Sequence, residues 1–227
     1  MFGNIFGSGD SIEAIILNVL VIVIPALMCI TIHELAHGFT AYRLGDRTAK
    51  DMGRLTLNPI RHIDPIGLLM MIVFRFGWAK PVPVNMYTFK HPKRYMAVTA
   101  FAGPLSNIIF ALIAMFLFGL LYVPILSMNS FAASSFFEEL FINLIWLNIM
   151  LAIFNMLPIP PLDGSKILFS ILSEQSYYKL MRYERFGMLI LIIALNIPGF
   201  RETLGTATRT LFASFSLIGD AAIRLVN

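Results

Sequence analysis

Long apolar runs without charge alternate with shorter polar segments along this chain. The first run, Ala14 to Ile32, contains no charged residue, and its helical pattern continues to about Leu44. Gly45 follows, and glycine commonly ends a helix because it adopts the left-handed conformation without strain. About 20 apolar residues span a bilayer as a helix. This segment is therefore predicted to be a membrane-spanning helix.

Further apolar runs predict more spans. Roughly 96–125 reads as a second span, and 140–162 gives a third whose helix is expected to end near Asn155. Residues 186–200 form a fourth, shorter candidate, and 203–227 has the pattern of an amphipathic or weakly inserted helix. The sequence thus predicts three core spans and about four to six in total.

The segment 46–94 differs from the rest of the chain, being rich in proline, glycine, arginine and lysine. A short apolar island, Gly67 to Ala79, is too short for a confident span. Its β-branched and aromatic residues, followed by Pro81-Val-Pro-Val84, favour a re-entrant or interfacial β-like segment. Basic loops stay on the cytoplasmic side of a membrane, so the 46–94 loop is predicted to be cytoplasmic and the N-terminus to lie on the far side.

Composition supports membrane insertion. The chain is 58% hydrophobic and only 13% charged, with a mean hydropathy of +0.78, whereas soluble domains carry about a quarter charged residues. No cleavable signal peptide is expected, because the N-terminus lacks a basic leader. The lone Cys29 excludes an internal disulfide and a four-thiolate metal site. The expected fold is an all-α polytopic membrane protein of one domain, 1–227, with a core at about 12–172 and additional helices at 173–227.

The strongest chemical signal is His33-Glu34-Leu-Ala-His37. Residues four apart lie on one face of a helix, so both imidazoles can bind one metal ion while Glu34 acts as general base on a metal-bound water. Ionisable residues at membrane depth are costly and usually functional. The alternative is that these are polar packing residues at a helix end.

A catalytic zinc usually has three protein ligands and one open position. Asp163 is a candidate third ligand, since a divalent cation would offset the cost of burying its carboxylate. It is equally a candidate N-cap for the helix that begins near Gly164. Residue chemistry leaves these two roles open.

Three motifs, in this order, resemble the signatures of the site-2 protease family. They are His33-Glu-Leu-Ala-His37, Gly103-Pro-Leu-Ser-Asn107 and Asn155-x-x-Pro-x-x-x-Leu-Asp163-Gly164. Strings in the basic loop, Asn58 to Gly67 and Trp78 to Asn85, resemble a small bacterial branch of that family. The chain has no segment that matches the PDZ or nucleotide-sensing domains of some members.

The resemblance implies an intramembrane zinc metalloendopeptidase with one Zn²⁺ per chain. His33, His37 and Asp163 would be the ligands, Glu34 the base, and Asn155 a substrate-binding residue. Asn107 would face the site, as a donor to the developing oxyanion, although interhelical hydrogen bonding is the simpler role for a buried amide. The implied partners are a transmembrane protein substrate and the lipid bilayer, with no nucleic acid. The implied location is the cell membrane, with the site near its cytoplasmic face.

Two other functions fit parts of the pattern. A transporter also carries buried ionisable groups, but its inverted repeats are not evident here. A catalytically silent relative would bind membrane helices without cutting them, and it would have no need of Glu34.

Overall fold

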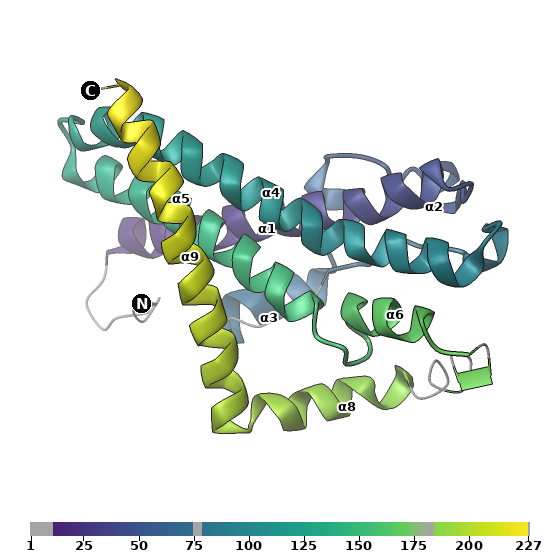
Figure 1. The fold of residues 1–227 in the computed structure, drawn as a ribbon. Coiled ribbons are helices and arrows are strands. Elements are labelled where there is room, and N and C mark those ends of the chain that lie inside the picture. The colour runs from purple at the N-terminus through teal and green to yellow at the C-terminus, as the bar shows by residue number, and fades with distance from the viewer. Residues whose placement is uncertain (1–10, 75–78, 174, 177–178, 180–183, 227) are drawn as a thin grey trace.

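The computed structural model describes residues 11–226 apart from 75–78, 174, 177–178 and 180–183, and within these residues the chain is helical without any strand (Figure 1). The predicted all-α class is therefore confirmed. Three helices are long: α1 (Ile12–Arg43), α4 (Pro92–Leu126) and α5 (Phe131–Asn155). The shorter elements and the C-terminal pair are α2 (Thr48–Asp51), η1 (Pro59–Arg61), α3 (Pro65–Phe74), η2 (Met86–Thr88), α6 (Asp163–Ser170), α8 (Glu184–Leu195) and α9 (Pro198–Val226).

The long helices α1, α4 and α5 are each long and apolar enough to cross a membrane. Local signals fix their ends. Ser11 caps α1 by accepting a hydrogen bond from the Ala14 N–H, and Gly45 follows its last turn with φ 108°. Ser130 caps α5 in the same way, so α5 begins earlier than predicted and carries Glu138 within its first turns. It ends at Asn155, as predicted.

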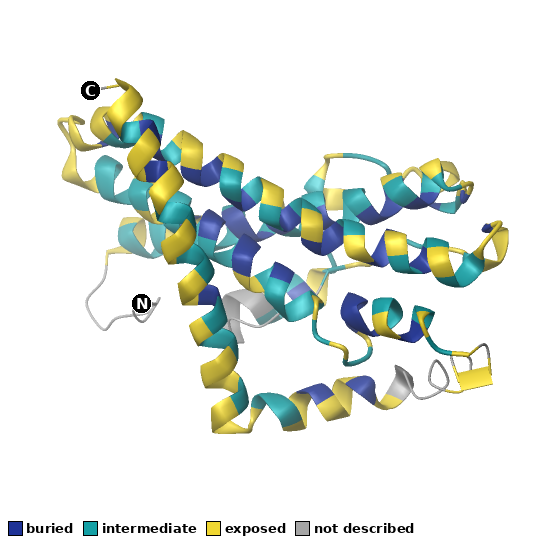
Figure 2. Cartoon of the chain, viewed as in Figure 1, coloured by how far each residue is buried: buried dark blue, intermediate teal, exposed yellow. Residues whose placement is uncertain are grey.

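The three long helices pack against one another around a core made of small and aliphatic side chains, namely Cys29, Ala111, Ala114, Met115, Leu144, Ile145 and Ile149. The outer face of α4 is also apolar but exposed, at positions spaced three or four apart: Val98, Phe101, Leu105, Ile109, Ile113, Leu117 and Leu121 (Figure 2). A helix that is apolar all round suits a hydrocarbon environment. This surface is the one expected to face lipid.

Of the two C-terminal helices, α9 crosses this bundle (Figure 1). Helix α9 packs over α4 and α5, and α8 meets α9 at a bend of 84° (Figure 1). Gly119 permits the close approach of α4 to α9, because a Cβ there would lie 2.8 Å from Ala222 Cβ and would overlap the Gly219 carbonyl oxygen. Small residues commonly allow such approaches in membranes. The predicted fourth candidate and the C-terminal helix correspond to α8 and α9.

The prediction of a β-like segment at Gly67–Ala79 is not confirmed. Residues 65–74 form helix α3, so the extended conformation expected from residue 67 onward is wrong for that part. Asp64 Oδ1 accepts from the Ile66 and Gly67 N–H groups at 3.0 and 2.9 Å, and Pro65 occupies the first helical position. These local start signals outweigh β-propensity, which depends strongly on context. The rest of the island, 75–78, lies outside the described residues.

After residue 78 the chain follows a non-helical course to Asn85, which we call the proline strap (residues 79–85). Ala79 forms an isolated antiparallel bridge with Ile63. Buried Arg54 donates from Nη2 to the Lys80 carbonyl at 2.7 Å, and buried Asp46 accepts from the Asn85 N–H at 2.7 Å. Both ends of the strap are therefore held by charged side chains.

Candidate metal centre

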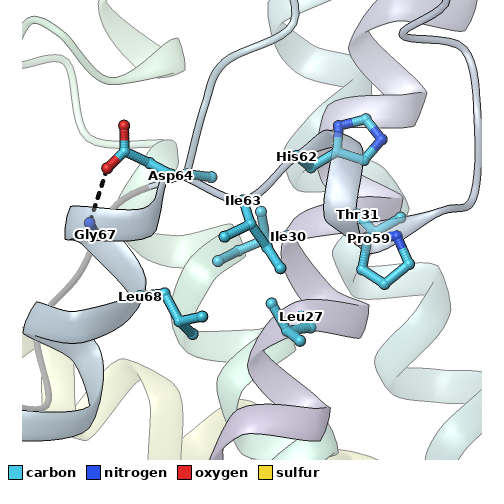
Figure 3. Close-up of a pocket in the computed structure, with 10 residues that line it drawn as sticks. Leu27, Ile30, Thr31, Pro59, His62, Ile63, Asp64, Gly67 and Leu68 are labelled. Atoms are coloured by element: carbon cyan, nitrogen blue, oxygen red, sulfur yellow. Dashed lines mark hydrogen bonds between the residues drawn. The ribbon is translucent and has the colours of Figure 1, made fainter.

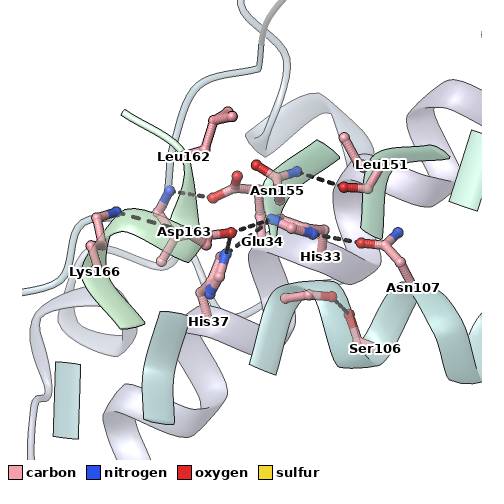
Figure 4. Close-up of polar contacts among 12 residues, drawn as sticks. His33, Glu34, His37, Ser106, Asn107, Leu151, Asn155, Leu162, Asp163 and Lys166 are labelled. Atoms are coloured by element: carbon pink, nitrogen blue, oxygen red, sulfur yellow. Dashed lines mark hydrogen bonds and ion pairs between the residues drawn. The ribbon is translucent and has the colours of Figure 1, made fainter. Parts of the chain in front are cut away.

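The side chains of His33, His37 and Asp163 converge between the long helices (Figure 4). Helix α1 supplies both histidines from adjacent turns, and Asp163 is the first residue of α6. The Asp163 Oδ2 atom lies 3.2 Å from His33 Nε2 and 3.1 Å from His37 Nε2, and the two Nε2 atoms are 3.0 Å apart. All three residues are buried. The chain thus brings together two imidazole nitrogens and one carboxylate oxygen from segments far apart in sequence.

A hydrogen bond at the Nδ1 atom of each histidine, on the side of the ring away from Asp163, fixes the tautomer of the ring. His37 Nδ1 lies 2.7 Å from the Thr99 carbonyl oxygen, and His33 Nδ1 lies 2.5 Å from Asn107 Oδ1. A carbonyl oxygen only accepts hydrogen bonds, so each Nδ1 carries the hydrogen and donates it. Each Nε2 then presents a lone pair toward Asp163. Histidines that bind metals are held by the same arrangement.

This donor set fits zinc. Three lone-pair atoms within 3.2 Å of one another repel unless a metal ion or a proton lies between them. Ligands at zinc distances of about 2.0–2.1 Å in tetrahedral geometry stand roughly 3.3 Å apart, close to the separations observed. Two imidazoles and a carboxylate leave a fourth position open, as catalytic zinc sites do.

Asp163 could be an N-cap or a metal ligand, and its position in the structure distinguishes these two roles. The N-cap of α6 is Leu162, and Asp163 follows it as the first helical residue. Its Oδ2 atom faces the histidines, and its Oδ1 atom lies 3.8 Å from Lys166 Nζ. Gly164 lets this turn abut the end of α5, since a Cβ there would overlap the Met156 carbonyl oxygen. The carboxylate is therefore aimed at the histidines and does not cap the helix.

Gly103 brings α4 against the two histidines. A Cβ at this position would overlap Nε2 of His37 and would lie 2.7 Å from Cε1 of His33. Ordinary contacts begin at 3.4 Å. Because α4 also carries Thr99 and Asn107, the close approach places both hydrogen-bond acceptors beside the rings.

Glu34 lies next to the cluster and is partly exposed. Its Oε2 atom accepts a hydrogen bond from the Val82 N–H of the proline strap at 2.7 Å. Among the described residues its Oε1 atom has no hydrogen-bond partner. The strap thus fixes one carboxylate oxygen and leaves the other available.

The two amides identified in the sequence lie in different surroundings (Figure 4). Asn155 ends α5, is partly exposed, and donates from Nδ2 to the Leu151 carbonyl at 3.0 Å. Asn107 is fully buried and donates from Nδ2 to Asn148 Oδ1 at 2.7 Å and to the Cys29 carbonyl at 3.3 Å. This bonding uses both amide hydrogens of Asn107 and leaves none for an oxyanion. These bonds favour the interhelical role for Asn107, whose Oδ1 atom also accepts the hydrogen bond that orients the His33 ring.

Sequence reasoning did not identify Thr99, Asn148 or Val82. Thr99 and Val82 act through backbone atoms, which leave no signal in side-chain chemistry. Asn148 did leave a signal, because an amide within a long apolar run needs a partner. Its partner, Asn107, could be identified only from the packing of α4 against α5.

The remaining polar candidates lie away from the cluster. His62 is buried, and its Nε2 atom lies 2.9 Å from the Thr56 carbonyl, while His91 is exposed. His62 and Asp64 line a cavity of about 20 Å³ between α1 and the η1–α3 segment (Figure 3). That volume holds about one water molecule and has no room for a peptide.

Comparison with known proteins gives a consistent result. The chain matches the model of Peptidase family M50 over residues 21–196. It is 41% identical over 177 residues to "Putative zinc metalloprotease YwhC" of Bacillus subtilis, covering 78% of this chain and 80% of that protein. It is 30% identical to "Putative zinc metalloprotease Rip2" of Mycolicibacterium smegmatis, covering 78% of this chain and 66% of the relative. The Rip2 protein of Mycobacterium tuberculosis strain H37Rv is 29% identical, with coverages of 76% and 65%. No solved structure matches the chain.

Proposed function

The chain belongs to Peptidase family M50, the site-2 protease family of zinc metalloproteases, and we propose that it is an endopeptidase that cuts peptide bonds in or near transmembrane segments of membrane proteins. The observation that carries this proposal is the convergence of His33, His37 and Asp163 beside Glu34. These residues lie among helices of membrane-spanning length, whose outer faces are apolar. A protease site enclosed by such helices is suited to substrates that are themselves in the membrane.

In this proposal His33, His37 and Asp163 hold one zinc ion. Bound zinc supplies Lewis acidity, which polarises a scissile carbonyl and makes a water molecule more acidic. The protein contributes the fixed directions of the ligands. The Thr99 carbonyl and the Asn107 amide hold the two rings so that both Nε2 lone pairs point inward.

Glu34 is proposed to move the proton. Its free carboxylate oxygen takes a proton from the attacking water and then delivers it to the leaving amine. The Val82 N–H holds the other oxygen, so the carboxylate keeps one orientation during both transfers. General bases of this kind typically accelerate a reaction by about 10²–10⁴-fold.

The proline strap and Asn155 are proposed to hold the substrate backbone. A transmembrane helix satisfies its carbonyls internally, so it must unwind before one of them can reach the site. The unwound backbone then needs new partners, because an unsatisfied polar group in apolar surroundings costs several kcal/mol. Arg54, Asp46 and Glu34 hold the strap in place beside the cluster. Strand addition at residues 79–85 would use the remaining backbone carbonyls of the strap, because prolines and these contacts occupy most of its N–H positions. Since α3 is helical, only the strap is proposed to take this role out of the segment that the sequence predicted to be β-like.

The proposed location is the cell membrane, with the 46–94 loop in the cytoplasm. His37 precedes Leu44, the C-cap of α1, by about seven residues, which is roughly 10 Å along the helix. The site would therefore lie inside the bilayer near its cytoplasmic face. The whole chain is proposed to act as one domain, since α9 packs directly on α4 and α5.

The test compares zinc content and cleavage of a transmembrane substrate in purified variants. His33→Ala, His37→Ala and Asp163→Ala are expected to lose both zinc and activity. Glu34→Gln is expected to keep zinc and to lose activity, because it removes the base and leaves the ligands in place. His91→Ala is the matched control, since this exposed histidine lies outside the cluster. Full zinc occupancy in Asp163→Ala would remove that residue from the ligand set, and unchanged cleavage by Glu34→Gln would refute its role as base.

A further inference from the structure

A buried network of amides and a thiol lies on the Nδ1 side of His33. It joins three helices through Cys29 of α1, Asn107 of α4 and Asn148 of α5, and all three residues are at most 1% exposed. We propose that Asn148 is a positioning residue of the metal centre: it fixes the orientation of the Asn107 amide and thereby keeps His33 in the tautomer that binds a cation. This inference rests on the proposed role of His33 as a zinc ligand.

The contacts form a directed chain. His33 Nδ1 donates to Asn107 Oδ1, and Asn107 Nδ2 donates to Asn148 Oδ1 at 2.7 Å. Asn148 Nδ2 then donates to the Leu144 carbonyl and to Cys29 Sγ, both at 2.8 Å. Each amide thus presents its oxygen to one neighbour and its hydrogens to the next. The Leu144 carbonyl can only accept a hydrogen bond, so the NH₂ group of Asn148 must face it. This requirement fixes the orientation of the Asn148 amide.

The two histidines differ in how securely their tautomers are fixed. His37 donates to the Thr99 backbone carbonyl, which cannot exchange an oxygen for a donor. His33 donates to a side-chain amide, which can rotate by half a turn and present its NH₂ group instead. After such a rotation His33 Nδ1 would have to accept a hydrogen bond, so its hydrogen would move to Nε2. A protonated Nε2 has no lone pair for a metal.

Asn148 opposes that rotation. If the Asn107 amide turned, its oxygen would face Asn148 Oδ1 and the Cys29 carbonyl, both of which are acceptors. Three buried acceptor oxygens would then face one another with no hydrogen between them, and the NH₂ group of Asn107 would face the His33 ring. Leaving buried polar groups unpaired costs about 1–3 kcal/mol each. With Asn148 in place, the orientation that serves His33 is therefore the stable one.

The decisive comparison uses three variants of α5. Asn148→Leu removes the acceptor for Asn107, whereas Asn148→Asp keeps an oxygen at that point. Asn143→Leu is the matched control, because Asn143 also makes an interhelical bond, partly buried, from Nδ2 to the Val21 carbonyl at 3.0 Å, but it lies outside the network. Zinc affinity is measured by competition with a chelator, and the melting temperature of each metal-free variant is measured alongside.

We expect Asn148→Leu to weaken zinc binding by about 10- to 100-fold, the range seen when partners of metal-binding histidines are removed. Asn143→Leu should stay within about twofold of the original affinity despite a similar loss of stability. Asn148→Asp should restore most of the zinc affinity, although a buried carboxylic acid is a harsher change for the fold. In metal-free protein labelled with ¹⁵N-histidine, NMR should show His33 protonated at Nδ1 and a shift toward Nε2 in Asn148→Leu.

Failure of this inference and failure of the proposed function would give different results. Zinc affinity of Asn148→Leu within about twofold of Asn143→Leu would overturn the inference, and so would an Asn148→Asp variant as weak as Asn148→Leu. Either result, together with loss of zinc in His33→Ala, would leave the proposed metal site intact. Tight zinc binding by His33→Ala would instead refute the proposed function on which the inference depends.

Discussion

Adding one methyl group at Gly103 should weaken the metal centre while leaving the fold largely intact. In Gly103→Ala the new Cβ would overlap Nε2 of His37 and would lie 2.7 Å from Cε1 of His33, where ordinary contact begins at 3.4 Å. Both obstructing atoms belong to side-chain rings. In the metal-free protein the rings can tilt about their Nδ1 hydrogen bonds to Thr99 and Asn107, but rings that also bind a cation cannot.

The magnitude follows from the geometry of zinc bonds. To relieve the contact, the distance between the new Cβ and His33 Cε1 must grow from 2.7 Å to about 3.4 Å. Zinc–ligand distances tolerate deviations of only about 0.2 Å. We therefore expect zinc affinity to fall by about 10- to 100-fold, which corresponds to roughly 1.4–2.8 kcal/mol. The melting temperature of the metal-free protein should change little.

Gly119→Ala is the matched control on the same helix. Its Cβ would overlap the backbone carbonyl of Gly219, which cannot turn aside, so α4 and α9 would have to separate. This variant should lose about 1–3 kcal/mol of stability through overpacking and should bind zinc normally. Chelator competition and thermal unfolding in detergent measure the two effects separately. If Gly103→Ala binds zinc as tightly as Gly119→Ala, the argument that Gly103 positions the histidines is wrong.

Three further predictions concern the substrate, the orientation and the proline strap. A substrate span containing Gly or Pro should be cut faster than an all-Leu span, because it unwinds more easily; equal cleavage rates would contradict strand addition. Single cysteines placed in the 46–66 loop of a Cys29→Ser background should react with a cytoplasmic reagent, and labelling only from the outer side would reverse the proposed orientation. Burial raises the pKa of Asp46, but hydrogen bonds from Thr48 and the Asn85 N–H outweigh it and hold the pKa below its ordinary value of 3.8. The lowered pKa means that this stabilisation is complete above the unfolded-state pKa and is lost as the pH falls through the folded-state pKa. Between about pH 5 and pH 3 the melting temperature should therefore fall more steeply in the original protein than in Asp46→Asn, and parallel slopes would refute this role.

Sequence alone determined the features that depend on local periodicity. A long apolar run forms a spanning helix whatever its neighbours, since lipid forces the backbone to bond internally. Gly45 marked the end of α1 and Asn155 the end of α5 for equally local reasons. The spacing of His33 and His37 placed two imidazoles on one helical face before any fold was known, because that spacing is set by the helix itself.

The tertiary structure decided what depends on contacts between segments distant in sequence. Asp163 could cap a helix or face the histidines, and only the packing of α6 against α4, which brings the carboxylate to the histidines of α1, separates these roles. Asn107 suited a donor to an oxyanion or an interhelical hydrogen bond, and its contacts with Asn148 and the Cys29 carbonyl favour the second role. The helix that begins at Pro65 is different, because local signals from Asp64 and Pro65 outweighed a β-like composition there. For Asp163 and Asn107 local chemistry allowed two outcomes, and a buried partner supplied by another helix favours one.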